Sequence, residues 1–85
     1  MADIQHEDFV GTVLDRCRSR RSLPTPSVAR AIREQAGISQ GEIASAVGVT
    51  RPAVSRWENG LRHPRGETLK RYAVLLSALA REMAG

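Results

Sequence analysis

The feature that most constrains the fold of this chain is the spacing of the residues that start and end helices. From position 25 onward, helix-capping residues alternate with glycines, in the pairs Thr25 and Gly37, Ser39 and Gly48, and Thr50 and Gly60. Ser39 is followed three residues later by Glu42, which is the arrangement of a capping box. No alternating pattern typical of a strand is present. The sequence therefore predicts consecutive short helices.

The remaining segments also have helical periodicity. An apolar stripe on a helix of roughly residues 7 to 20 consists of Phe9, Val10, Val13, Leu14 and Cys17. Pro24 and Pro26 end that helix, and Pro26 also suits the first turn of the next one, whose core-facing stripe is Val28, Ile32 and Ala36 or Ala29, Ile32 and Ala36. A last helix of about residues 67 to 83 has one apolar face made of Leu69, Tyr72, Ala73, Leu76, Leu79, Ala80 and Met83.

The expected fold class is therefore all-α, a small helical bundle of about five helices. Residues 1–25 are expected to form an extra N-terminal helix with a proline-containing linker, and residues 26–85 the main domain. With only 85 residues, the chain is too short for a multidomain enzyme.

Composition narrows the possible partners. The 13 Lys and Arg against 9 Asp and Glu leave a net charge of +4, which favours an anionic partner, although the preference for Arg over Lys fits a GC-rich genome equally well. With one Phe, one Trp and one Tyr, there is no aromatic platform for stacking single-stranded bases, so duplex DNA is favoured. One Cys and two His make no zinc set, and no apolar run approaches the length of a membrane span. The chain is expected to be cytoplasmic, without metal, cofactor or membrane contact.

The stretch from Gln40 to Asn59 carries the functional signal. Two helices that cross closely through a short turn need a small residue at the crossing and a residue that tolerates positive φ in the turn, and Ala44 and Gly48 meet these needs. The apolar residues Ile43, Val47, Val49, Val54 and Trp57 can close one shared core. The other face of the second helix is then free, and it holds Arg51, Pro52, Ser55 and Arg56.

The segments Ser39–Ala44, Gly48–Thr50 and Ser55–Gly60, with this set of apolar, small and capping positions, resemble the lambda-repressor-like (Cro and Xre type) helix-turn-helix family. The resemblance runs from about Val28 to Leu79. It implies that the helix from about residue 50 to 58 enters the major groove of DNA. The family often pairs through its C-terminal elements, and here a longer last helix stands in place of a separate fifth one.

The resemblance also assigns roles to single positions. It places Arg51, Pro52, Ser55 and Arg56 toward base edges, where Arg suits guanine and the Pro ring suits a thymine methyl. Phosphate contacts are expected from Gln40, Thr50, Asn59, Arg62, His63 and Arg65. Arg33 is expected to form a largely buried structural ion pair with Glu58.

Each of these positions also has a purely structural interpretation. An isolated pair such as Arg51 and Arg56 is commonly just a solvated face, Thr50 just a cap, and His63 a solvated loop residue. Asn59 with Gly60 also stops a helix. Four arginines at positions 16 to 21 could reach a phosphate or simply complement the dipole of their own helix.

The favoured hypothesis is a sequence-specific regulator of transcription that binds duplex DNA, most simply a repressor. One half-site of about five base pairs gives too few contacts, so two copies are expected on an inverted repeat with centres about 34 Å apart or a multiple of it. The dimer surface is either Phe9, Val10 and Val13 or Leu75, Leu79 and Met83, unless these pack within one chain. The alternative is an antitoxin or adaptor with a protein partner, reached through the N-terminal helix. An enzyme is disfavoured because no catalytic or phosphate-binding motif is present.

Overall fold

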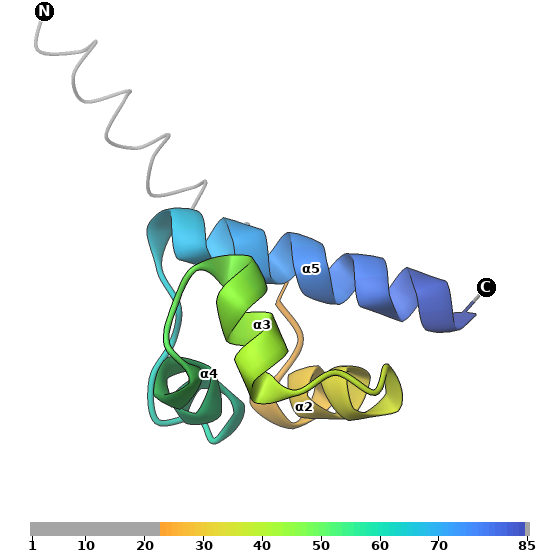
Figure 1. Cartoon of the computed structure of the whole chain (residues 1–85), viewed down its shortest axis with the longest axis horizontal. Coiled ribbons are helices and arrows are strands. Elements are labelled where there is room, and N and C mark those ends of the chain that lie inside the picture. The colour runs from red at the N-terminus through yellow and green to blue at the C-terminus, as the bar shows by residue number, and fades with distance from the viewer. Residues whose placement is uncertain (1–22, 85) are drawn as a thin grey trace, which may run out of the picture.

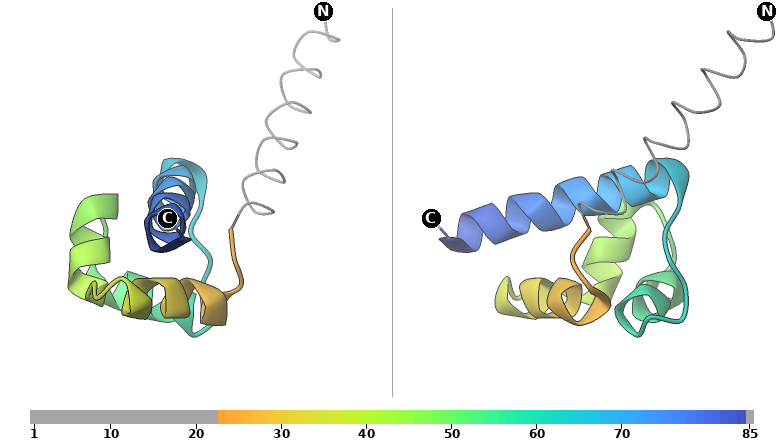
Figure 2. Two further views of the ribbon diagram at one scale, coloured as in Figure 1. Left: turned by 90° about the vertical axis from the view of Figure 1, so that its right-hand side faces the viewer. Right: turned by 180° about the vertical axis from the view of Figure 1, so that it is seen from behind.

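The computed structural model describes residues 23–84, which form four helices and no strand. These are α2 (Pro26–Gln35), α3 (Gln40–Val47), α4 (Arg51–Glu58) and α5 (Gly66–Ala84). In Figure 1, α5 runs along one side of the molecule, and α2 and α4 lie opposite it. The left view of Figure 2 shows that α3 flanks α5 and α2 on one side. The all-α class is confirmed for this part of the chain. The expected N-terminal helix lies outside the described residues, and the domain division at residue 25 stays a prediction.

The helix ends follow from local chemistry. The Thr25 hydroxyl accepts a hydrogen bond from the Val28 amide at 3.4 Å, and Pro26 occupies the first turn of α2. The capping box of α3 is confirmed, since the Ser39 hydroxyl accepts from the Glu42 amide and the Glu42 carboxylate accepts from the Ser39 amide, each at 3.0 Å. These reciprocal bonds satisfy donors that a helix N-terminus otherwise leaves unpaired.

All four helices contribute to one core. Its buried apolar side chains are Ala29, Ile43, Ala44, Val47, Val54, Trp57, Leu69, Tyr72 and Leu76. Helix α3 packs against α4 and α5, and α2 packs against the same two helices. The Trp57 and Tyr72 rings lie with their centroids 4.8 Å apart at an interplanar angle of 45°, which joins α4 directly to α5. The core therefore fixes α4 against the other three helices.

Two details of the predicted stripes are settled by packing. On α2 the core-facing position is Ala29, at 3% exposure, while Val28 is 48% exposed. On α5 the expected core position Met83 is 39% exposed, because the last turn of a helix this long has less of the body beneath it. A further correction concerns Thr50, which stands at the N-cap position of α4 without any side-chain capping bond.

The turn between α3 and α4 depends on Gly48, whose φ is +86°. Its amide donates to the Ala44 carbonyl at 2.8 Å, and Val49 donates to the same oxygen at 2.9 Å. A methyl group at Gly48 meets no close neighbour, since its nearest contact is the Arg71 guanidinium at 3.6 Å. The requirement for glycine is therefore one of backbone conformation.

Gly48→Ala is expected to lower the free energy of unfolding by about 1–2 kcal/mol, because an L-residue is strained in the left-handed region. Gly41→Ala is the matched control, since Gly41 lies within α3 with φ in the ordinary range and open space for a methyl group. The control is expected to gain up to about 1 kcal/mol from helix propensity. Urea unfolding measures both, and equal effects of the two substitutions would contradict the assigned role of Gly48.

Candidate DNA-binding surface

Helix α4 has one buried face and one open face. Val54, Trp57 and Glu58 are buried at 0%, 8% and 6% exposure. On the opposite side, Arg51, Pro52 and Arg56 are exposed and Ser55 is half-buried. Pro52 is in the first turn, where no helical donor is lost. The core thus holds α4 rigidly while the side chains expected to contact bases face solvent.

The carboxylate of Glu58 ties three helices together. The Arg33 guanidinium donates from Nε to Oε2 at 2.7 Å and from Nη2 to Oε1 at 3.0 Å. The same guanidinium donates from Nη1 to the Ile38 carbonyl at 2.9 Å, in the turn between α2 and α3. Gln40, the first residue of α3, donates from Nε2 to Oε1 of Glu58 at 3.0 Å. The end of α4 is therefore fixed to α2, to the α2–α3 turn and to the start of α3.

This network determines the protonation of Glu58. Burial by itself raises the pKa of the Glu58 carboxyl, but the hydrogen bonds from Arg33 and Gln40 and the charge of Arg33 outweigh burial, so the pKa lies below its ordinary value. The hydrogen bond to Glu58 outweighs burial at Arg33 also, and the pKa of Arg33 is raised. Burial, together with the charge of Glu58, raises the pKa of the Tyr72 hydroxyl to about 12. At neutral pH the pair is fully ionised.

The lowered pKa of Glu58 makes stability depend on acid pH. A carboxyl whose pKa is lower in the folded than in the unfolded chain contributes stability above the unfolded value, near 4.5, and loses it as pH falls through the folded value. The free energy of unfolding is thus expected to fall from about pH 5 downward, and to fall less steeply in Glu58→Gln. Urea unfolding at a series of pH values measures both slopes, and parallel slopes would contradict this assignment.

The expected phosphate-contacting residues occupy two different settings. Thr50 is exposed, and its hydroxyl makes no hydrogen bond within residues 23–84. Gln40 is half-buried, and its bond to Glu58 uses one of its two amide hydrogens, which leaves the other for an outside acceptor. The sequence carried no signal for this link between Gln40 and Glu58, because the two residues are brought together only by the crossing of α3 and α4.

Unlike Thr50 and Gln40, Asn59 uses its side chain for a contact with the helix that it ends. Its side-chain amide donates to the Ser55 carbonyl at 2.8 Å and approaches the Ser55 hydroxyl at 3.5 Å. The Asn59 amide nitrogen is therefore directed back at the last turn of α4. This geometry favours the helix-ending role of Asn59, and a phosphate contact requires its amide to rotate away.

The loop after α4 carries basic side chains that line a groove together with Arg56. Arg62, His63 and Arg65 are exposed, whereas Pro64 between them is buried and anchors the loop. A shallow groove of about 620 Å³ has Arg56, Arg62, His63 and Arg65 in its wall, with Ala53, Trp57, Leu61, Pro64 and Thr68. We call it the cationic groove. No carboxylate lines this groove, and none of the ion pairs within the described residues uses these three arginines.

The described region shows no cluster of His, Cys, Asp or Glu that could hold a metal ion. None of the helices α2–α5 has an apolar stretch long enough to cross a membrane.

Comparison with known proteins agrees with this geometry. A helix-turn-helix family model matches residues 30–77, so the chain belongs to the helix-turn-helix family of Cro/C1 type. Among curated proteins, it is 37% identical over 73 residues to Antitoxin HigA1 of Mycobacterium tuberculosis, in each of two strains. That match covers 86% of this chain and 47% of the relative, so the chain spans about half the length of these relatives. No solved structure matches the chain significantly.

Proposed function

We propose that this protein is a sequence-specific regulator of transcription, a repressor, that places α4 in the major groove of duplex DNA. The observation that carries the proposal is the setting of α4, whose open face adjoins the cationic groove while its inner face is fixed by the core and by Glu58. A helix that reads base edges must be held rigidly, because a bidentate Arg contact tolerates little displacement. Arg51, Pro52, Ser55 and Arg56 are the proposed base contacts.

The proposed phosphate contacts flank this helix. Thr50 and Gln40 lie at the starts of α4 and α3, where backbone amides also point outward at an anion. Arg62, His63 and Arg65 lie on the loop that follows α4. Residues 50–65 hold four Arg against one Glu, so most of the net charge is concentrated on the proposed DNA-facing side.

Selection of binding sites from random duplexes tests the proposal directly. The expected result is an enriched inverted repeat with half-site centres about 34 Å apart or a multiple of it, bound by two copies. Affinity for the selected site is expected to fall with salt, with a slope of about 0.9 per neutralised phosphate on logarithmic axes. Recovery of no common sequence, together with a salt slope near zero, would overturn the proposal.

A second candidate function is that of an antitoxin, and the observation favouring it is the similarity to Antitoxin HigA1. If the chain is an antitoxin, its main partner is a toxin protein, and its binding to DNA is secondary. The test is relief of growth arrest when the neighbouring open reading frame is expressed with and without this chain. Relief that persists in the variant with Arg51 and Arg56 replaced by Ala would assign neutralisation to another surface, while absence of any relief would reject this candidate.

A further inference from the structure

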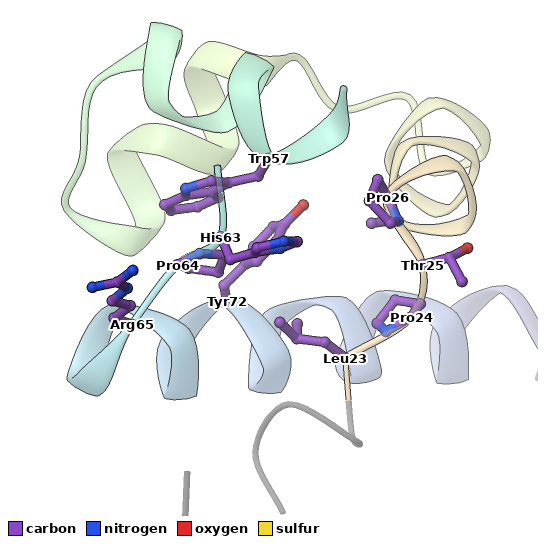
Figure 3. Close-up of a pocket in the computed structure, with 10 residues that line it drawn as sticks. Leu23, Pro24, Thr25, Pro26, Trp57, His63, Pro64, Arg65 and Tyr72 are labelled. Atoms are coloured by element: carbon purple, nitrogen blue, oxygen red, sulfur yellow. The ribbon is translucent and has the colours of Figure 1, made fainter. Parts of the chain in front are cut away.

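A second hollow lies between the start of α2, the end of α4 and the first turns of α5 (Figure 3). Its volume is about 340 Å³, and its wall is mostly apolar, with Leu23, Pro24, Pro26, Trp57, Pro64 and Tyr72 as the main contributors. We call it the apolar hollow. It shares Trp57, Pro64, His63 and Arg65 with the cationic groove, so the two adjoin.

The lining of the apolar hollow defines what fits there. Its volume is at the lower end of the roughly 300–1,000 Å³ of ligand pockets, which is room for a few apolar side chains. Covering apolar surface stabilises a protein by about 25 cal/mol for each Å² removed from water. Arg65 adds a positive charge at one end of the hollow. An apolar segment flanked by carboxylates is the complementary occupant.

We propose that the leader segment, defined as residues 1–22 of this chain, folds back and fills the apolar hollow with side chains of its apolar stripe. The stripe members Phe9, Val10, Val13 and Leu14 supply the required apolar groups. Leu23 is both the first described residue and part of the wall of the hollow, so the C-terminal end of the leader segment is joined directly to the wall of the hollow.

The short connection between the apolar stripe and Leu23 favours the leader segment, over a free ligand or a second copy, as the occupant of the apolar hollow. Eight residues separate Leu14 from Leu23, and fully extended they span up to about 26 Å, which is ample for a reversal. A segment tethered by a short linker is present at an effective concentration of about millimolar order, so a contact with a dissociation constant below about 1 mM is mostly formed.

The acidic residues of the leader segment also favour it as the occupant of the apolar hollow. Residues 1–15 contain Asp3, Glu7, Asp8 and Asp15 and no Lys or Arg. Two of these acids, Glu7 and Asp8, directly precede Phe9 and so come near His63 and Arg65 when the stripe is docked. The four arginines between positions 16 and 21 fall in the connection, outside the docked part.

Nuclear Overhauser effects in the full chain test the docking. Phe9, Trp57 and Tyr72 are the single residues of their types, so each ring gives one set of signals. We expect contacts from the Phe9 ring and from the Val13 and Leu14 methyl groups to the Trp57 and Tyr72 rings. Absence of any such contact would overturn the proposal. Contacts seen only between differently labelled copies would also overturn it, by making a second copy the occupant.

A pair of aspartate substitutions supplies the matched control. Val13→Asp places a charge on the stripe, whereas Thr12→Asp adds the same charge outside the stripe on the expected helix. Val13→Asp is expected to abolish the ring contacts and to raise the acrylamide quenching of Trp57 fluorescence, because burying an unpaired charge in the apolar hollow is unfavourable, while Thr12→Asp leaves both unchanged. Equal responses of the two variants would reject the docking. Neither measurement involves DNA, so failure here leaves the proposed function untouched.

Discussion

Arg33→Met is expected to lower the free energy of unfolding by about 3–5 kcal/mol, the largest effect of any single substitution considered. The Glu58 side chain is only 2% exposed, and Arg33 supplies two of its three hydrogen bonds. Removing the guanidinium leaves a buried carboxylate with Gln40 as its remaining donor and frees the Ile38 carbonyl of its bond. Total stabilities of small domains are about 5–15 kcal/mol, so this loss is large.

A double-mutant cycle measured by urea unfolding isolates the interaction energy between Arg33 and Glu58 from the contacts that each makes with other residues. Arg33→Met combined with Glu58→Leu is expected to cost clearly less than the sum of the two single substitutions, because no unpaired charge stays buried. Arg30→Met serves as the control, since Arg30 pairs with Glu34 on the surface and exposed pairs contribute about 0–1 kcal/mol. Additive single effects would show that Arg33 and Glu58 do not act as a unit.

Arg56→Ala is expected to cost about 1–3 kcal/mol of binding to the selected duplex and to relax the preference at one base position. Arg56 is exposed on the open face of α4 and lines the cationic groove, and it has no ion pair within residues 23–84. Truncation of such a side chain removes no core contact, so the thermal midpoint of unfolding is expected to stay nearly constant. Fluorescence anisotropy on the selected site and on single-base variants measures the effect.

The matched control for Arg56 is Arg81→Ala, which removes an equal charge near the C-terminal end of α5, far from α4 (Figure 1). It is expected to leave binding almost unchanged. An equal loss for Arg56→Ala on every duplex would make Arg56 a phosphate contact and not a base contact. No loss at all would remove α4 from the DNA interface.

Part of the surface of α4 could be predicted from the sequence and part could not. The open position of Arg51, Pro52 and Arg56 follows from helical periodicity once Val54 and Trp57 are assigned to the core. The hydrogen bond from Gln40 to Glu58 had no such signal, since it joins residues 18 apart on different helices. Thr50 stands at the expected N-cap position of α4, but within residues 23–84 its hydroxyl makes no capping bond, because a capping residue type favours a helix start without fixing the rotamer of its side chain.

The sequence by itself determined where α2, α3 and α4 begin and end. These signals act locally: the capping box of Ser39 and Glu42 acts through bonds between residues three apart, and prolines and Gly48 act through their own backbone conformation. No tertiary contact is needed to place them. Only the tertiary structure decided that Ala29 and not Val28 faces the core, that Glu58 joins three helices, and that Arg56 meets the loop cations in one groove. These outcomes depend on the angles at which the helices cross, and side-chain packing sets those angles over the whole core at once.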